Sequence, residues 1–144
     1  MLVGKYQNSI DAKGRMIIPA KFREELGTKC VVTKALDHCL EIHPIAEWEE
    51  FVNGKLKTLS MFDPKARQLA RYFASSAEVF DVDKQGRLTI SQELREFAGI
   101  EKELITIGSF DKLEIWSKEA WEKYEHEREM SASAIAECMV DYGL

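Results

Sequence analysis

Long hydrophobic runs are missing from this sequence, and cysteine is scarce. No run approaches the roughly 20 apolar residues of a membrane-spanning helix, and the first residues lack the apolar stretch of a secretion signal. The cysteines Cys30, Cys39 and Cys138 form no Cys-x-x-Cys pair. Such an odd set is typical of reduced thiols in a cytosolic protein. We therefore expect a cytoplasmic protein without a membrane partner.

Motifs for enzymatic chemistry and for cofactors are also missing. The sequence has no glycine-rich phosphate loop and no Ser-His-Asp or Cys-His pattern. Cys39 and His43 are four residues apart and could be joined only by Cys30 or His38, whereas a structural zinc site takes two such pairs. We expect no cofactor, no metal, no small-molecule substrate and no enzymatic activity.

The charge of the chain is negative overall but unevenly distributed. The formal net charge is −5, which on its own argues against a nucleic-acid partner. Residues 1–36, however, carry seven Lys or Arg against three acidic residues, a net charge of +4 that leaves −9 for the other 108 residues. Because the local potential governs phosphate binding, a basic N-terminal part on an acidic body still permits a DNA-binding surface.

An internal repeat organises the sequence. Residues 11–27 and 83–99 align at a constant offset of 72, and seven of the 17 positions are identical. The similarity resumes at 40–42 and 113–115 and again at Trp48 and Trp121. A repeat of this kind indicates a duplicated structural unit. We expect domains at 5–51 and 77–124, a linker helix at 52–76 and a helical tail at 125–144.

The pattern inside each unit predicts short strands and helices. Residues 79–82 and 87–90 are strand-like and flank Asp-Lys-Gln-Gly, which suits a type I turn and predicts a hairpin. Residues 19–26 predict a short helix that ends at Gly27, and 30–34 with 40–42 predict a second hairpin before a helix from Pro44. A linker helix starting at Asp63-Pro64 and one long helix from Ser117 complete the prediction. A unit of about 47 residues cannot cover its own apolar face, so each needs the other.

The Asp-x-x-Gly-Arg turn and the following Ile-Pro-x-x-Phe-Arg helix resemble the AbrB/SpoVT class of DNA-binding domains. Two copies, each followed by Leu-Glu-Ile and a Trp, resemble the MraZ family in particular. The matching residues are Tyr6, Asp11, Lys13, Gly14, Arg15, Ile18, Pro19, Phe22, Arg23, Asp83, Gly86, Arg87, Ile90, Leu94, Arg95 and Trp116. The resemblance implies an α+β, β-rich fold of two swapped-hairpin units in an intrachain pseudo-dimeric barrel, with connecting and C-terminal helices.

The same resemblance implies a regulator of the division and cell-wall gene cluster, including its own operon. It would bind tandem repeats of promoter DNA as a ring-like homo-oligomer and associate with the nucleoid. The candidate DNA-contacting residues are Lys13, Arg15, Lys21, Arg23, Lys84 and Arg87. The turns would be held by Asp11, Gly14, Asp83 and Gly86. The second unit has Ser, Gln and Glu where the first has Pro19, Lys13 and Lys21, so its DNA contacts are expected to be weaker.

Three alternatives follow from the same residues. Arg15 could pair with Asp11 to close the turn, a role that is compatible with DNA contact because Arg has several N–H donors. Asp11 and Asp83 could form the paired carboxylates of an aspartic protease, but neither is followed by the small hydroxyl residue and Gly of such a site, and an Arg four residues on would keep each ionised. An antitoxin-like module that binds a toxin partner is the remaining alternative.

The linker and the tail carry two further expectations. Leu69, Tyr72 and Phe73 of the linker helix, with Ile135 and Met139 of the tail, form apolar faces without an assigned partner, and such faces indicate an oligomer interface. Residues 117–144 carry a net charge of −4. Because this charge repels DNA, the tail is expected to lie on the far side of the molecule from the basic turn.

Overall fold

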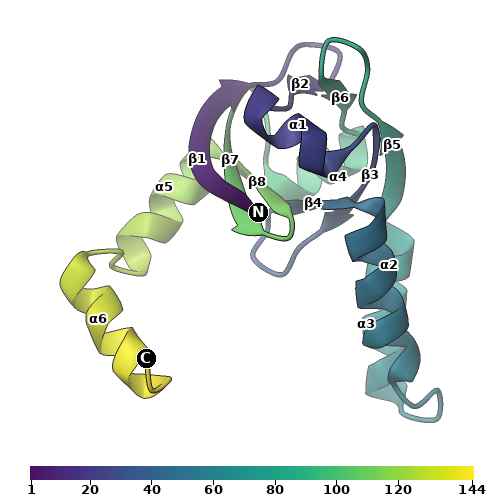
Figure 1. The fold of residues 1–144 in the computed structure, drawn as a ribbon, viewed down its shortest axis with the longest axis vertical. Coiled ribbons are helices and arrows are strands. Elements are labelled where there is room, and N and C mark those ends of the chain that lie inside the picture. Colours follow the sequence, from purple (N-terminus) through teal and green to yellow (C-terminus); the bar gives the residue numbers. More distant parts are fainter.

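The computed structural model describes all 144 residues and has an α+β fold (Figure 1). The first repeat contains β1 (Leu2–Ser9), β2 (Arg15–Ile17), α1 (Ala20–Leu26), β3 (Lys29–Lys34), β4 (Leu40–Pro44) and α2 (Ile45–Gly54). The second contains β5 (Glu78–Asp81), β6 (Arg87–Thr89), α4 (Gln92–Ala98), β7 (Glu103–Phe110), β8 (Leu113–Ser117) and α5 (Lys118–Glu127). The short helix η1 (Leu56–Thr58) and α3 (Pro64–Ser76) lie between the repeats, and α6 (Ala132–Asp141) ends the chain.

The strands of the two repeats are exchanged. The main sheet has the order β1-β7-β8-β4-β3-β5, so β1 pairs with β7 of the second repeat and β5 with β3 of the first. The remaining strands β2 and β6 pair with each other. The predicted hairpin between 79–82 and 87–90 is therefore wrong as a strand pair, although its turn is present. Strands as short as β2 and β6 bury Met16 and Leu88 only when they meet across the repeats.

Three other local predictions are confirmed: the β3–β4 hairpin, the short helix before Gly27 and the helix start at Asp63. Strands β3 and β4 form an antiparallel hairpin, and its turn places His38 at φ 55°. Helix α1 follows Pro19 and ends at Gly27, which has φ 83°. Helix α3 is capped by Asp63, whose carboxylate accepts the backbone N–H of Lys65. These elements agree with the sequence because their signals, a turn, a cap and a stop, are local.

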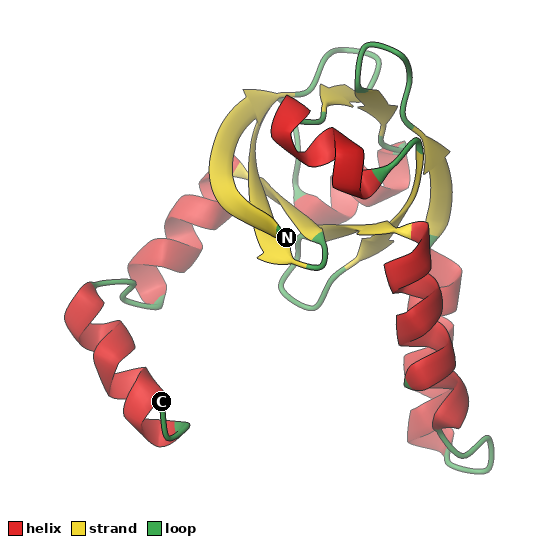
Figure 2. Cartoon of the chain, viewed as in Figure 1, coloured by secondary structure: helices red, strands yellow, loops and turns green.

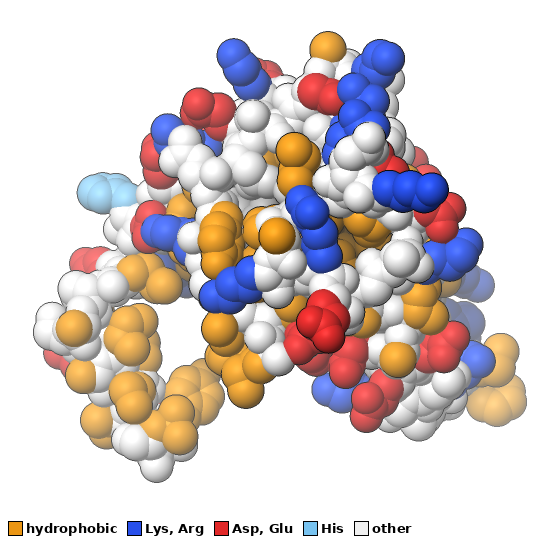
Figure 3. Space-filling model, turned by 45° about the horizontal axis from the view of Figure 1, so that its top comes forward, with side chains coloured by type: hydrophobic (Ala, Val, Ile, Leu, Met, Phe, Trp, Pro, Cys, Tyr) orange, Lys and Arg blue, Asp and Glu red, His pale blue; other side chains and the backbone are white.

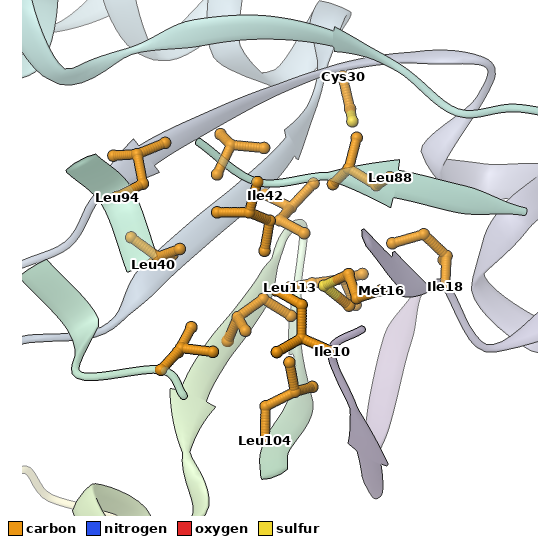
Figure 4. Packing of buried hydrophobic residues seen from close by; sticks show 14 of the residues in the cluster. Ile10, Met16, Ile18, Cys30, Leu40, Ile42, Leu88, Leu94, Leu104 and Leu113 are labelled. Atoms are coloured by element: carbon orange, nitrogen blue, oxygen red, sulfur yellow. The ribbon is translucent and has the colours of Figure 1, made fainter. Parts of the chain in front are cut away.

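One hydrophobic core joins the two repeats, as expected from their size. Figure 4 shows residues from both repeats packed together, among them Ile18 and Leu40 of the first and Leu88 and Leu94 of the second. Helices α1 and α4 contribute the buried side chains of Phe22 and Leu94. Neither repeat encloses these side chains by itself, so the two repeats share a single core.

The expected barrel is not confirmed. The main sheet is open, because β1 pairs only with β7 and β5 only with β3. The β2–β6 pair is not hydrogen-bonded as a strand to either edge strand, β1 or β5, of the main sheet. An isolated bridge links Met16 of β2 to Ile10, just after β1. The sheet nevertheless curves around the core and α1 (Figure 2). Its curvature places the β2–β6 pair across the open side of the sheet, where it covers the core.

Helices α2 and α3 lie side by side as an arm below the sheet (Figure 1). Phe73 packs edge-to-face on Phe51 with ring centroids 5.3 Å apart, and the Tyr72 hydroxyl donates to the Ala35 carbonyl at 2.6 Å. The expectation that Tyr72 and Phe73 lack a partner is therefore wrong, since both are used within the chain. Leu69 remains exposed.

The C-terminal segment is not the single long helix that the sequence predicted. It consists of α5 and α6, separated at residues 128–131, where Glu129 has φ 47°. The Ser131 hydroxyl accepts the backbone N–H of Ala134 and so begins a new helix. As expected, α6 lies at the opposite end of the molecule from the two turns (Figure 1). No helix is both long and apolar enough to span a membrane.

Candidate nucleic-acid interface

The first turn, residues 11–15, is held by the carboxylate of Asp11. One oxygen accepts the backbone N–H groups of Lys13 and Arg15, each at 2.9 Å. The other oxygen accepts Nε of the Arg15 side chain at 2.7 Å. The pairing of Arg15 with Asp11, which the sequence left open as an alternative, is present and holds the guanidinium of Arg15 along the turn. The terminal nitrogens of Arg15 have no partner in the chain.

The second turn, residues 83–87, repeats this geometry. Asp83 accepts the backbone N–H groups of Gln85 at 2.9 Å and Arg87 at 2.8 Å, and Nε of Arg87 at 2.8 Å. One difference lies at Gln85, whose side-chain oxygen accepts a terminal nitrogen of Arg87 at 3.1 Å. Arg87 therefore has fewer free donors than Arg15.

Both turn carboxylates are ionised at neutral pH. The backbone N–H of Arg15 holds the pKa of Asp11 below its usual value; desolvation opposes this shift, whereas the Arg15 side chain and the backbone N–H of Lys13 add to it. The backbone N–H and side chain of Arg87 lower the pKa of Asp83 in the same way. Two ionised carboxylates on separate turns cannot share a proton, so the geometry argues against the aspartic-protease alternative.

The β2–β6 ribbon joins the two turns and presents both arginines on one face. Arg15 lies opposite Thr89, and Ile17 opposite Arg87. Met16 and Leu88, between them, point into the core. The outer face therefore carries Arg15, Ile17, Arg87 and Thr89, with Ile17 53% exposed. The sequence prediction missed Ile17 and Thr89, although the alternation along Arg15-Met16-Ile17 could have revealed them.

Exposed lysines complete the two turns. Lys13 lies on the first turn and Lys84 on the second, and neither forms an ion pair. In Figure 3, Lys and Arg side chains stand at the end of the molecule that carries the turns, with acidic side chains beside them. Each turn thus has one lysine and one arginine. Although Gln85 aligns with Lys13, the neighbouring Lys84 gives the second turn the same number of cations as the first.

Comparison with known proteins places the whole chain in one family. The family described as "MraZ protein, putative antitoxin-like" matches residues 1–72 and again residues 73–142. The chain belongs to the MraZ family. The "Transcriptional regulator MraZ" of Thermoanaerobacter sp. (strain X514) is 49% identical over the full length of both chains. Proteins of the same name from Acetivibrio thermocellus and Clostridium botulinum (strain Eklund 17B / Type B) are 46% and 48% identical, again over both full lengths.

Two of the candidate DNA-contacting residues lie on helix α1 of this MraZ family member and have different surroundings. Lys21 is exposed and lies over β1, with Nζ 5.7 Å from the centre of the Tyr6 ring. Arg23 is half-buried, and its Nε donates to the Ile18 carbonyl at 2.9 Å. Its guanidinium lies against Gly86 of the second turn. The structure thus brings Arg23 to a turn and places Lys21 beside β1 instead.

Gly86 is expected to tolerate no side chain. It is buried, has φ 80°, and an added Cβ would lie 2.3 Å from the Arg23 guanidinium. Gly86→Ala should therefore lower the free energy of unfolding by about 1–3 kcal/mol, the cost of backbone strain, together with displacement of Arg23. Denaturant unfolding measures this loss. Gly54→Ala is the matched control, because Gly54 has ordinary φ and open space around it; equal stability of the two variants would contradict the prediction.

Proposed function

We propose that the protein is a sequence-specific DNA-binding transcriptional regulator without enzymatic activity, and that the β2–β6 ribbon with its two turns contacts DNA. The observation that carries the proposal is the pairing of β2 with β6, which puts Arg15 and Arg87 on one exposed face. A two-stranded ribbon fits the major groove, which is about 12 Å wide. The relatives named transcriptional regulators support the same function.

The residues divide into base-reading and phosphate-binding groups. Arg15 uses Nε on Asp11 and keeps its terminal nitrogens for the edge of a guanine, a bidentate contact that the rigid turn orients in advance. Arg87 has the same pose with one donor shared with Gln85. Lys13 and Lys84 are exposed, and the long, compactly charged side chain of lysine suits phosphate contact. Lys21 is proposed as a further phosphate contact only where DNA reaches β1.

The net charge of −5 is compatible with this role because of where the charges lie. The acidic helices α5 and α6 extend away from the turns (Figure 1). Surface charges farther apart than the Debye length, about 8 Å at physiological salt, are largely screened from one another. The turns can therefore attract phosphate while the tail remains acidic.

Family membership supports a more specific proposal. We propose that the two domains, 5–51 and 77–124, act together in a ring-like homo-oligomer on short direct repeats of promoter DNA. The target would be the division and cell-wall gene cluster, including the chain's own operon, in the nucleoid of the cytoplasm. The exposed side chains of Ile135 and Met139 on α6 support self-association, since apolar surface of this kind marks interfaces.

Footprinting on the DNA upstream of the chain's own gene tests the proposed function. We expect protection of several short, regularly spaced segments, lost when their sequence is scrambled at constant composition. Affinity should fall as salt rises, because phosphate contacts release counterions. Failure to protect any segment, combined with a pull-down that recovers one stoichiometric small protein, would instead support the antitoxin-like alternative that the family description mentions.

A further inference from the structure

Each turn is braced by the helix of the opposite repeat. The backbone N–H of Ile90 donates to the carbonyl of Gly14 at 2.8 Å, and the carbonyl of Ile90 accepts Nε of Arg95 at 3.0 Å. Arg95 belongs to α4 of the second repeat, whereas Gly14 belongs to the first turn. A continuous chain of hydrogen bonds therefore runs from α4 to the residue directly before Arg15.

The same chain exists in the other direction. Ile18 donates its N–H to the carbonyl of Gly86 at 2.8 Å and accepts Nε of Arg23 at 2.9 Å. The two hydrogen-bond chains have the same form. The contact between each helix and the turn of the other repeat therefore follows from the exchange of strands, which is common to both repeats. Neither arginine forms an ion pair that would offer another reason for its position.

Close packing accompanies these hydrogen bonds. A Cβ built on Gly14 would lie 3.1 Å from the guanidinium carbon of Arg95, and one on Gly86 would lie 2.3 Å from that of Arg23. Both glycines are buried, and both have φ 80°. The flat guanidinium of each arginine thus covers the bare backbone of the opposite turn, a contact that a lysine cannot reproduce.

We infer that Arg95 is a positioning residue for the first DNA-binding turn, and that Arg23 serves the second turn in the same way. This inference rests on the proposed function for its effect on DNA. Arg95 fixes the backbone at Gly14, and this backbone sets the direction in which Arg15 leaves the turn. The roles assigned by sequence are thereby changed: Arg23 acts through Gly86 rather than through phosphate, and Arg95 controls the first turn without touching DNA.

The first arm of the test uses the protein without DNA. Amide resonances of Gly14 and Gly86, and hydrogen exchange of the Ile90 and Ile18 amides, are compared between Arg95→Ala and Arg23→Ala. We expect Arg95→Ala to shift Gly14 and to accelerate exchange at Ile90, while Arg23→Ala shifts Gly86 and accelerates exchange at Ile18. Unchanged resonances at the opposite turn, or changes confined to the arginine's own repeat, would overturn the inference. This arm stands even if the protein binds no DNA.

The second arm uses the specific DNA site. Arg95→Ala and Arg95→Lys should each weaken binding roughly tenfold, the scale of coupling through a structural contact, with the salt dependence unchanged. A direct phosphate contact would behave differently, because Lys would restore binding and Ala would lower the slope against log salt by about 0.9. Either of these results would overturn the inference. Arg71→Ala, an exposed arginine on the distant helix α3, is the matched control and should bind as the unaltered chain does.

Discussion

Arg15→Ala is expected to weaken binding of each subunit to its specific site by about 1–3 kcal/mol, the value of one bidentate base contact. The loss arises because the terminal nitrogens of Arg15 are free to donate to a base, whereas Nε is held by Asp11. In an assembly that holds several sites, the free-energy losses of the subunits add up, so binding at physiological salt should disappear. A titration of labelled promoter DNA measures the effect, with and without sequence scrambling.

Stability separates base reading from turn closure. The Arg15–Asp11 pair is substantially exposed, with side chains 31% and 41% accessible, and exposed pairs of this kind contribute little to stability. The melting temperature of Arg15→Ala should therefore change little. Arg87→Ala is the matched comparison and should cost less affinity, because Gln85 already occupies one donor of Arg87. Arg15→Ala that unfolds, or that binds DNA unchanged, would make Arg15 a turn clamp only.

Affinity is expected to rise steeply with the number of DNA repeats. One ribbon offers few cations, chiefly Lys13, Arg15, Lys84 and Arg87, so a single subunit releases few counterions and binds weakly. Subunits joined in one assembly hold neighbouring repeats at a high effective concentration, which raises affinity by about 10²–10⁴-fold without a new contact. Fragments with one, two and three repeats, titrated under the same salt, measure this gain.

Spacing provides the control for that gain. If subunits sit side by side in one orientation, repeats one helical turn apart, about 10 bp, present the same groove to each ribbon. Inserting about half a turn between repeats should abolish the gain, and inserting a full turn should largely restore it. Light scattering should show a closed oligomer at micromolar concentration. Equal affinity for a lone repeat, indifference to spacing, or a stable monomer would each contradict assembly-dependent binding.

The local geometry of the site was predictable because its signals are local. Asp11 and Gly14 are separated by the spacing of a type I turn, and the structure closes the turn with hydrogen bonds between residues at most four apart. The helix that ends at Gly27 and the hairpin of β3 and β4 follow from similarly short-range patterns. The repeat itself indicated that two units would share a core.

The pairing of the strands was decided by the tertiary structure. A hairpin inside one repeat and an exchange between repeats use the same turn and the same alternating residues, so the sequence pattern does not distinguish them. Burial of Met16 and Leu88 against the common core selects the exchange. The exposed face of Ile17 and Thr89, and the open edges of the sheet, follow from that choice.

The sequence by itself determined the duplication, because two segments 72 residues apart align without gaps, and the two turns, because each depends on neighbours within a few positions. The residues that contact DNA remain a prediction. Only the tertiary structure determined that Arg23 and Arg95 reach the opposite turns, since Gly86 and Gly14 are more than 60 residues away along the chain. Contacts at such separation depend on how the two repeats pack, and packing reflects the volume and burial of the whole core rather than any local pattern.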